Sequence, residues 1–564
     1  MSETQVVFTL TAKCMDCYRC LKVCPVKAIK MKDGQAQVDP NLCIACGTCV
    51  RECPQKAKAY LSGVESAKRA IESGSAVAMV APSFAAFYDK WERLRFIGAL
   101  RRLGFKLVEE TAEHAYDVSM NVKTIAGNAK RKHICTACPA FTQFAEKYRE
   151  DAVELLTPVV SPMIQHANEI FMKYSGMMKP VFIGPCIAKK KEALKYPQLL
   201  EAVLTFEEIE KMFEEKGIEL KNCEESFFDG GVKGHARWYP LGGGLLKTAY
   251  GDDISAVKTC VPEGFTEIED ALESVIESDE GIIVEPLFCK GGCVKGPGGR
   301  KDVNFYVAKK RLAEYIESAP VNGEAGFKPV MKAEFLFKSA KGADITEAEI
   351  EKMLEKTGKG NPAQRLNCGA CGYESCREKA IAVIRGMAEP EMCMPVMRRL
   401  AEQRTDRIIE TSPNGIVIVD REMKIIKMNA AFGAMFRCAG RQGAHVSDVI
   451  DPLPFEKLAS ETEDMIQETA AHPRAGITCH QIFYRMKEEN HYVGIFVDLT
   501  RLTNTDKRLA ELKEKTINQA KQLLEHQLKM AQDMALYLGE NTAKSEELLH
   551  RLVVAAGGKD ENRK

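Results

Sequence analysis

The chain has 564 residues, among them 79 Lys plus Arg, 79 Asp plus Glu and 21 cysteines. This length is too great for one domain, and the balanced charge gives no net field that would draw the protein to nucleic acid or to an anionic membrane. No apolar run approaches the ~20 residues of a membrane span, and the opening MSETQVVFTL does not resemble a signal peptide. We therefore expect a cytoplasmic multidomain protein whose clustered cysteines bind metal rather than form disulfides.

Residues 1–62 contain two copies of one cysteine pattern, CMDCYRCLKVCP and CIACGTCVRECP. Each copy reads C-x2-C-x2-C-x3-C-P, the bacterial ferredoxin pattern, in which the fourth cysteine of each copy ligates the cluster of the other copy. The pattern predicts a ferredoxin-like α+β domain with two four-iron clusters. The ligands expected for the first cluster are Cys14, Cys17, Cys20 and Cys53. The ligands expected for the second are Cys43, Cys46, Cys49 and Cys24.

Residues 63–330 alternate apolar strand-like runs, such as AVAMVAP and VFIGPC, with helical patterns, which predicts an α/β domain. Ligands of such domains gather on loops beyond the strand ends. Three loops here carry cysteines beside prolines or glycines: ICTACPAF, FIGPCIAKKKE and EPLFCKGGCVKGPGG. Cys289 and Cys293 are four residues apart, so one helical turn would place both thiols on one face. Together with Cys138 and Cys186 they make a third set of four cluster ligands.

Residues 331–400 are expected to form a small helical domain around another cysteine set, in NCGACGYESCREKA and EMCMP. Three closely spaced thiols and a fourth that returns after a helix suit a further four-iron cluster. A structural zinc ion is the alternative, because four thiolates suit either metal. The ligands would be Cys368, Cys371, Cys376 and Cys393.

Residues 401–503 are poor in cysteine and have an α+β pattern. The stretch RIIETSPNGIVIVDREMKIIKMNAAFGAMF predicts a helix, a turn, two strands and a helix, and ITCHQIFYRM and HYVGIFVDLT predict closing strands. This pattern resembles a PAS sensory domain. Four of its histidines are of a type that ligates haem, but no neighbouring sequence supports that role: His445, His472, His480 and His491.

Residues 504–564 form a charged segment with a helical pattern. Ile517, Leu524 and Leu538 fall near heptad spacing, which predicts a C-terminal helix that pairs as a coiled coil in a homodimer. A solvated amphipathic helix is the alternative reading of the same residues.

The three cysteine loops of residues 63–330, in this order behind a ferredoxin repeat, resemble the H-cluster domain of iron-iron hydrogenases. The resemblance covers residues 1–330, and the region from Cys368 through the PAS-like domain resembles the extension of a sensory branch of that family. It implies a four-iron cluster on the third cysteine set. It also implies that Cys293 bridges this cluster to a di-iron subsite that carries CO, cyanide and a dithiolate.

The resemblance assigns roles to three further residues. Lys189 would donate a hydrogen bond to a cyanide ligand, since an ammonium is a compact donor; a surface lysine is the alternative. Ser161 would lie near the active site, with a helix N-cap as an equal alternative. Ala137 stands where catalytic members of the family have the cysteine that gives protons to the di-iron subsite, and a methyl group cannot carry a proton.

A second departure from the family concerns the rest of the proton path. The paired glutamates that continue this path align with Asn121 and Val122. Every expected metal ligand is present while the proton path is not, so we expect dihydrogen binding with slow turnover. A CxxC redox pair of Cys135 with Cys138 remains open. The cysteines otherwise expected to be inert thiols are Cys135, Cys223, Cys260, Cys438 and Cys479.

The function predicted from these features is that of a sensory iron-iron hydrogenase of an anaerobe. It would bind dihydrogen at the H-cluster, pass electrons through three 4Fe-4S clusters, and signal through the PAS-like domain and the C-terminal helix to a downstream kinase, phosphatase or regulator. One rival is a catalytic hydrogenase that exchanges electrons with a ferredoxin. The other is a non-enzymatic iron-sulfur scaffold or assembly protein without a di-iron subsite.

Overall fold

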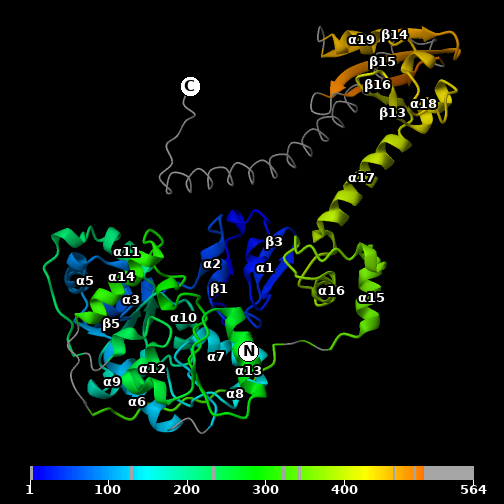
Figure 1. The fold of residues 1–564 in the computed structure, drawn as a ribbon. Helices are drawn as coiled ribbons and strands as arrows, with labels where there is room; N and C mark the ends of the chain where they lie inside the picture. Colours follow the sequence, from blue (N-terminus) through cyan, green and yellow to red (C-terminus); the bar gives the residue numbers. More distant parts are fainter. Residues whose placement is uncertain are drawn as a thin grey trace. The chain divides into compact units, whose positions relative to one another are not determined.

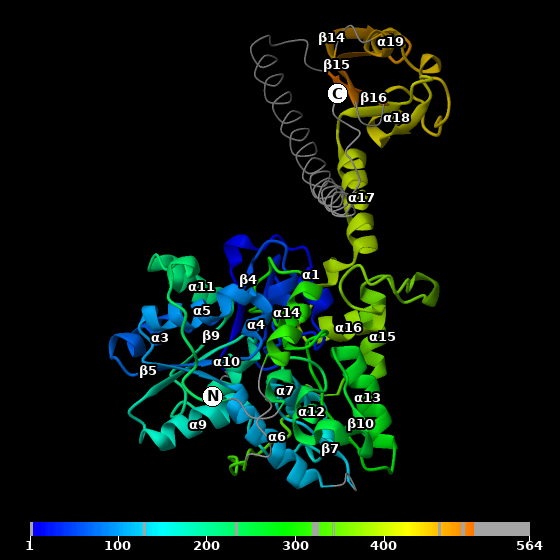
Figure 2. The same ribbon diagram turned by 60° about the vertical axis from the view of Figure 1, so that its left-hand side comes forward.

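The computed structural model describes residues 4–500, apart from residues 128–130, 232–234, 319–325, 341, 343, 461–463 and 487–490. The chain forms two compact units, Met1–Met397 and Arg398–Lys564, drawn as ribbons in Figures 1 and 2. The segment 504–564, with its predicted coiled coil, lies outside the described residues. Within the described ranges no helix combines the length and the apolar character needed to cross a membrane.

The N-terminal cysteine-rich part repeats one small pattern of structure. Each cysteine loop leads into a short helix, and the residue before that helix is left-handed in both copies: Tyr18 at φ 55° and Gly47 at φ 74°. Two antiparallel pairs of strands, β1 with β4 and β2 with β3, accompany the helices. The elements are β1 (Val7–Thr9), η1 (Thr11–Lys13), α1 (Arg19–Val23), β2 (Ile29–Lys32), β3 (Gln35–Val38), α2 (Thr48–Glu52) and β4 (Lys58–Tyr60).

An α/β domain follows, built on a parallel sheet in the order β6-β5-β8-β9. All five residues of β5 are buried, as expected of a parallel strand covered on both faces. These strands are β5 (Ala76–Val80), β6 (Leu107–Glu110), β8 (Lys179–Ile183) and β9 (Ala202–Leu204). A second parallel sheet, in the order β10-β11-β7, consists of β7 (His133–Ile134), β10 (Thr259–Cys260) and β11 (Ile283–Val284). The predicted α/β class is therefore the one observed.

Helices cover the sheets and supply the loops that carry cysteines. Helix α5 begins with a capping box of Asp89 and Glu92 and ends at the left-handed Gly104, while α7 begins with Pro139 directly after Cys138. The α-helices are α3 (Val64–Glu72), α4 (Phe84–Phe87), α5 (Lys90–Leu103), α6 (Ala112–Ala126), α7 (Pro139–Tyr148), α8 (Glu150–Val153), α9 (Pro162–Lys173), α10 (Ala188–Ala193), α11 (Phe206–Glu215), α12 (Gly244–Tyr250), α13 (Phe265–Glu277) and α14 (Phe305–Glu317). The 3-10 helices are η2 (Leu220–Asn222), η3 (Ala236–Trp238), η4 (Gly251–Ala256) and η5 (Cys293–Lys295).

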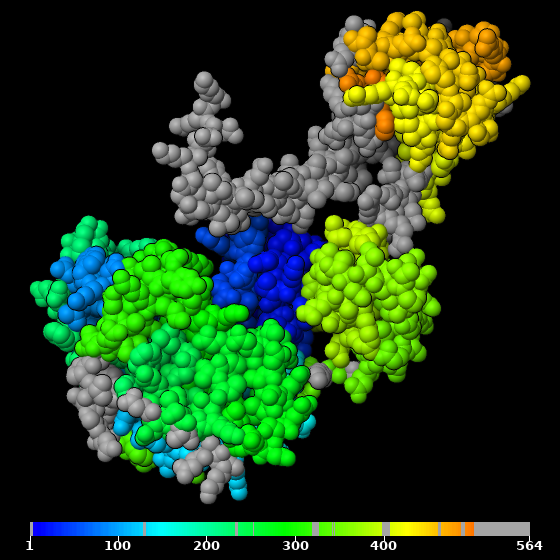
Figure 3. Space-filling view, in the orientation of Figure 1, coloured from blue at the N-terminus to red at the C-terminus, as the bar shows by residue number. Residues whose placement is uncertain are grey.

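The last part of the first unit is small and helical, and it packs against the N-terminal part. Met31 N donates to Met387 O over 2.9 Å, and Lys27 Nζ donates to Gly372 O over 3.0 Å. Figures 1 and 3 accordingly show the blue N-terminal part between the α/β domain and the helices α15 and α16. One buried apolar cluster spans all three parts, from Ile44 through Phe288 to Met392. The elements are α15 (Glu347–Lys356), η6 (Pro362–Gln364), α16 (Cys376–Ile384) and η7 (Pro390–Met392), and α17 (Met394–Thr411) runs on into the second unit.

The second unit holds a five-stranded antiparallel sheet in the order β13-β12-β16-β15-β14. Its core gathers Phe432, Phe455, Phe483 and Phe496. The predicted strands and helix are present, and β14 and α19 are elements that the sequence pattern did not indicate. The elements are β12 (Gly415–Val419), β13 (Ile425–Met428), α18 (Ala430–Met435), η8 (Val446–Asp448), α19 (Leu453–Ala459), β14 (Met465–His472), β15 (Ile477–Met486) and β16 (His491–Asp498).

Candidate metal centres

The first cysteine set of the N-terminal part lies together in the structure. The pKa of the Cys20 thiol is raised by burial, and the negative charges of Cys17, Cys14 and Cys53 raise it further, while Lys58 acts in the opposite direction. Cys53 comes from the second copy of the repeat, so the two copies exchange their fourth cysteine in the way that the ferredoxin pattern predicts. Cys17 is exposed and Cys20 is buried, which puts one edge of this set at the surface.

The second set lines a single pocket together with the start of α2. Its sulfur ligands would be Cys24, Cys43, Cys46 and Cys49. Burial, with the charge of Cys46, raises the pKa of the Cys24 thiol to about 12, and burial with the same charge raises that of Cys43 to about 11. Backbone N–H groups face the sulfurs: Ala28 N lies 3.2 Å from Cys24 Sγ, and Ala45 N lies 3.3 Å from Cys43 Sγ.

The third set comes from three loops of the α/β domain, and its four thiols also converge. The pKa of the Cys289 thiol lies well above its usual range because of burial and, in decreasing order, the charges of Cys186, Cys138 and Cys293. Burial, with the charge of Cys138, raises the pKa of Cys186 to about 12. Four thiols held this close are hard to ionise by themselves, and bound iron would supply the positive charge that stabilises them as thiolates.

The local structure of Cys289 and Cys293 differs from the helical turn predicted from their spacing. Gly291 and Gly292 between them are left-handed, at φ 93° and φ 70°, and the turn closes through Gly292 N donating to Cys289 O over 3.0 Å. Cys293 then opens the 3-10 helix η5. The prediction of one α-helical turn was wrong, because Gly291 and Gly292 have positive φ angles. Gly292 also passes so close to Pro240 O that a side chain would not fit there.

Lys189 and Ala137 meet beside the third set. Lys189 Nζ donates to Ala137 O over 3.4 Å and to Glu192 Oε2 over 2.8 Å. The lysine is 9 % exposed, and its charge lowers the pKa of Cys293 against the larger effect of burial. Because Lys189 is buried, the alternative that it is a surface lysine is excluded.

Ser161 occupies the N-cap position of α9, as one reading of the sequence predicted, but its side chain makes no capping hydrogen bond. The residue is 1 % exposed, and Ser161 Oγ has no hydrogen-bond partner among the described residues. A buried hydroxyl of this kind is uncommon and calls for a partner of another type. The hydroxyl is therefore available to a group bound in the domain.

Asn121 and Val122, the positions compared with the family's proton-carrying glutamates, have structural contacts. Asn121 Nδ2 donates to Asp117 O and Lys328 O over 2.8 and 2.7 Å. Val122 is fully buried in an apolar cluster that Ala137 also contacts. Neither side chain carries an ionisable group in this part of the fold.

Sequence reasoning missed a buried carboxylic acid next to Cys135. Strands β7 and β11 pair in parallel with Ile134 opposite Val284, so the following residues, Cys135 and Glu285, sit side by side. Burial raises the pKa of Glu285 to about 7, although the N–H groups of Leu246 and Leu245 bond its carboxylate and act in the opposite direction. Burial, with the Glu285 charge, holds the pKa of Cys135 well above its usual range. Cys135 is thus a buried thiol beside an acid rather than an activated thiolate.

A second buried group that the sequence did not reveal lies on α9. His166 Nε2 is 2.9 Å from Glu109 Oε2, and the His166 ring is 4.5 Å from that of His114. Burial lowers the pKa of His166 to about 4 in spite of Glu109. The imidazole is therefore neutral at physiological pH. Only a pairing across 57 residues of sequence creates this site, so no local pattern could have indicated it.

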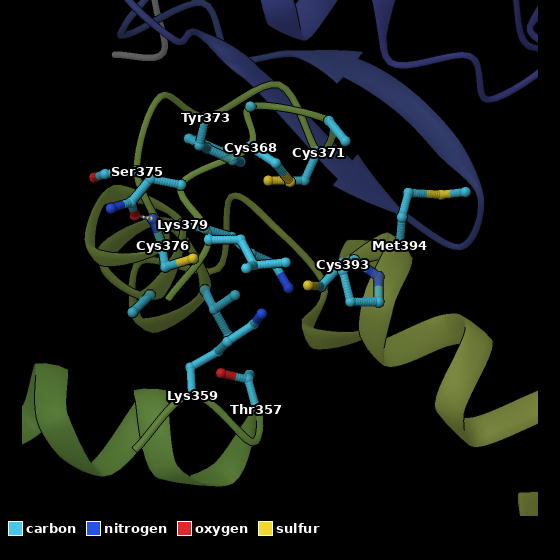
Figure 4. A pocket seen from close by; sticks show the side chains of 17 residues that line it. Thr357, Lys359, Cys368, Cys371, Tyr373, Ser375, Cys376, Lys379, Cys393 and Met394 are labelled. Carbon is cyan, nitrogen blue, oxygen red and sulfur yellow. Dashed lines mark hydrogen bonds between the residues drawn. The ribbon is translucent and has the colours of Figure 1, made fainter. Parts of the chain in front are cut away.

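The fourth cysteine set lines a pocket of its own, shown in Figure 4. The sulfurs of Cys368, Cys371, Cys376 and Cys393 surround a common space, with Lys379 and Lys359 reaching toward it. Cys376 begins α16, and Cys393 follows η7, so the fourth thiol does return after a helix as predicted. Gly372 lies close to the N-terminal part, since a Cβ on it would be 3.1 Å from Leu21 Cγ and 3.4 Å from Lys22 N.

The donor chemistry of these sets fits iron-sulfur clusters. Thiolates are the soft ligands that clusters require. At the fourth set, Tyr373 Oη is buried and without a hydrogen-bond partner among the described residues, and a cluster sulfur would accept its hydrogen. In the part of the chain that the structure describes, no three Cys, His, Asp or Glu side chains gather as they would around one metal ion. The sulfurs of the second and fourth sets line pockets instead.

The second and third sets lie next to each other. The charge of Cys46 is among those that act on Cys289. A Cβ on Gly47 would come within 2.5 Å of Pro297 Cγ and 2.8 Å of Ile187 Cδ1. Loops of the N-terminal part and of the α/β domain are therefore in direct contact at this point.

Comparison with known proteins finds matches to family models in four segments. Residues 13–57 match the model of a 4Fe-4S dicluster domain, and residues 75–297 match that of the iron only hydrogenase large subunit, C-terminal domain. Residues 364–395 match an iron-sulfur cluster model, FeS, and residues 403–469 match a PAS domain. The periplasmic Fe hydrogenase large subunit of Nitratidesulfovibrio vulgaris is 25% identical over 360 residues, which are 51% of this chain and 84% of that protein.

Two solved structures are also similar. A variant of the FeFe-hydrogenase HydA1 from Chlamydomonas reinhardtii has 18% identity and a TM-score of 0.37, and the match covers 45% of this chain and 88% of that one. The PAS domain of an HTR-like protein from Haloarcula marismortui has 17% identity and a TM-score of 0.15, covering 18% of this chain and 98% of that one.

Proposed function

We propose that this chain, which carries an iron-only hydrogenase domain behind a dicluster ferredoxin domain and ahead of a PAS domain, is a sensory hydrogenase. It binds dihydrogen at an H-cluster, turns it over slowly and reports the resulting redox state to a signalling partner. An H-cluster, when bound, supplies the metal chemistry that interconverts dihydrogen with protons and electrons. The residues of the chain bind and orient this group and conduct charge away from it.

One observation carries the hydrogenase part of the proposal. Cys138, Cys186, Cys289 and Cys293 converge from three loops, and Lys189 points from the second loop to the first at Ala137 O. This arrangement supports an H-cluster on these four thiols with Lys189 as a donor at its di-iron end. The orphaned hydroxyl of Ser161 is a second donor for the same ligand shell.

Slow turnover is supported by the groups around Ala137. A general acid must lie within hydrogen-bond reach of the proton it transfers. Ala137 has a methyl group in the position in question, and Asn121 and Val122 are engaged in structural contacts. The chain thus keeps the ligands of the family and lacks the side chains that would feed protons to the metal.

The signalling part of the proposal is supported by chain organisation. A change of redox or ligation state in one domain can bias a bistable element elsewhere in the chain, and the PAS domain matched over residues 403–469 would supply that element. Further parts of the proposal are three 4Fe-4S clusters on the other cysteine sets, a homodimer, a cytoplasmic location, and a kinase, phosphatase or regulator as the downstream partner.

Infrared spectroscopy on anaerobically matured protein tests the proposal. We expect CO and cyanide stretches, and about 18 iron atoms per chain, counted as three 4Fe-4S clusters plus a six-iron H-cluster. Cys138→Ser should abolish the CO and cyanide bands. Cys135→Ser, a change three residues away in the same loop, should leave them in place and serves as the matched control.

The outcomes separate the alternatives. Absence of CO and cyanide bands in correctly matured protein would favour an iron-sulfur scaffold. Fast dihydrogen evolution by the unaltered chain would favour a catalytic, ferredoxin-dependent hydrogenase. About 14 iron atoms with one zinc would assign the Cys368 site to zinc.

A further inference from the structure

Two buried polar side chains at the Cys368 site lack a role in the predicted ligand set. Lys379 on α16 is 6 % exposed and Tyr373, in the loop after Cys371, is 4 % exposed. Lysine is almost never buried to this degree without a partner. The one side-chain hydrogen bond of Lys379 in the described structure runs from Nζ to Pro390 O over 2.5 Å, and an ammonium has three hydrogens to give.

The amino group of Lys379 is turned toward the cysteines. Burial lowers the pKa of the amine, and the charges of Cys393 and Cys371 raise it again, followed by Glu391 and Cys376. Figure 4 shows the amino group turned into the space that the four sulfurs surround. The amino group of Lys379 therefore faces the same pocket as the four sulfurs.

Tyr373 lies between this site and the second set of the N-terminal part. Burial raises the pKa of its hydroxyl, and the next largest effects are the charges of Cys371 and Cys24. Tyr373 Oη has no hydrogen-bond partner among the described residues. Because a buried donor without an acceptor is unfavourable, a cluster sulfur is the acceptor that the position calls for.

We infer that Lys379 and Tyr373 raise the reduction potential of a four-iron cluster bound by the Cys368 set. Reduction adds one electron and no proton to such a cluster, so the reduced form carries one more negative charge. A nearby ammonium and a hydroxyl donor both favour that form, since cluster potentials depend on local charge and on hydrogen bonds to sulfur. The inference rests on the part of the proposed function that places iron, not zinc, at this site.

The location of Tyr373 indicates what a raised reduction potential at the Cys368 site would do. The fourth site adjoins Cys24, whose own set adjoins the third site through Cys46 and Cys289. The second set is thus a junction with neighbours on two sides. A raised potential on the Tyr373 side makes the fourth site the place where an electron is retained.

Redox titration monitored by electron paramagnetic resonance tests the inference on the full-length holoprotein. Lys379→Gln removes the charge but keeps an amide donor for Pro390 O. We expect the ratio of reduced to oxidised cluster at a fixed potential to fall about tenfold, equivalent to about 59 mV for one electron. Tyr373→Phe removes only the hydroxyl, and a smaller fall in the same direction is expected.

Two variants and one internal reference provide the controls. Lys352→Gln removes an exposed lysine from α15, which packs against α16, and should leave the potential unchanged. Tyr148→Phe removes a hydroxyl that donates to Leu42 O beside the second set, and should not affect the fourth site. The potentials of the two ferredoxin-type clusters in Lys379→Gln should equal those of the parent.

An unchanged or higher potential in Lys379→Gln and Tyr373→Phe, with the iron content of the parent, would overturn the inference. Loss of about four iron atoms from both variants would also overturn it, because the residues would then serve cluster assembly. Zinc at the Cys368 site of the parent protein would also overturn the inference, because the inference requires an iron-sulfur cluster there. The proposed hydrogenase function is tested separately, by the CO and cyanide bands.

Discussion

Lys189 Nζ donates a hydrogen bond to the main-chain oxygen of Ala137 over 3.4 Å. Lys189 lies on α10, three residues after Cys186, and Ala137 directly precedes Cys138. One ammonium thus bridges two of the three loops that carry the third cysteine set. The same group bonds Glu192, which fixes the direction of the lysine side chain. The interaction joins two residues of the proposed function, Lys189 as a hydrogen-bond donor to the di-iron subsite and Ala137 as a position without a proton donor.

Replacing Ala137 with cysteine should increase dihydrogen evolution. A positioned acid or base typically contributes on the order of 100- to 10,000-fold to a rate. Asn121 and Val122 still interrupt the path, so we expect a gain of about 100-fold or less. The thiol should also give the infrared bands a pH dependence that the parent lacks.

The control for this change is Ala137→Ser, which has a similar volume but no group that titrates in the accessible pH range. Rates are compared at equal H-cluster occupancy. Equal rates for parent and Ala137→Cys would remove the missing-donor explanation, and so would a parent that is already as fast as a catalytic hydrogenase.

Replacing Lys189 with methionine should weaken retention of the di-iron subsite. Groups that orient metal ligands are typically worth about 10- to 100-fold in affinity, and the lysine is held in place by Glu192. Because methionine would leave that carboxylate without its partner, the cleaner test is Lys189→Met combined with Glu192→Gln. The intensity of the CO and cyanide bands measures occupancy.

The matched control is Glu192→Gln alone, in which the ammonium remains beside Ala137 O. Its bands should stay near parental intensity. Bands of parental intensity in the double variant as well would show that the lysine does not help to retain the di-iron subsite.

Glu285 should titrate close to neutrality in the folded protein. Its pKa rises from 4.5 to about 7, mainly through burial, which corresponds to about 3 kcal/mol. The folded state binds the proton more tightly than the unfolded state does, so the stabilisation is complete below pH 4.5 and is lost as the pH rises through about 7. The infrared carboxyl stretch should follow this titration.

The variant Glu285→Gln lacks the carboxyl group, so the infrared band that it loses is the band of Glu285. The same variant is the reference for the stability of the parent. The melting temperature of the parent should fall relative to that of this variant as the pH rises from 4.5 to about 7. A difference that stays constant with pH would show that folding does not raise the pKa of the Glu285 carboxyl group.

Removing residues 504–564 should weaken self-association and leave the metal spectra unchanged. The expectation comes from the heptad-like spacing of Ile517, Leu524 and Leu538. Light scattering on the full-length and shortened proteins gives the mass per particle. Equal masses would discard the coiled-coil prediction in favour of a solvated helix.

Local spacing indicated which cysteines lie together in the first, second and fourth sets, because each of these sets has three thiols in one short loop and a fourth from another segment. The exchange of Cys24 and Cys53 between the two repeats follows from the pattern alone, and so does the return of Cys393 after a helix. The turn from Cys289 to Cys293 was predicted wrongly, since the left-handed Gly291 and Gly292 preclude a helix there.

What the sequence could not reveal depends on contacts between distant segments. Tyr373 becomes informative only once the fold brings it close to Cys24, and Glu285 only once β7 and β11 pair. The buried state of Lys189, adjacent to two other lysines in the sequence, likewise depends on how α10 packs. Burial and neighbours, rather than residue type, decide the chemistry of these three side chains.

Gly47 limits how freely the N-terminal domain can be exchanged for another. A side chain there would overlap Pro297 and Ile187 of the α/β domain, and the residue is left-handed at φ 74°. A ferredoxin-like domain grafted in place of residues 1–62 would need a glycine at the same loop position. Without it the graft would fold and bind its clusters yet stand away from the hydrogenase domain, and electron transfer across that gap would be slower.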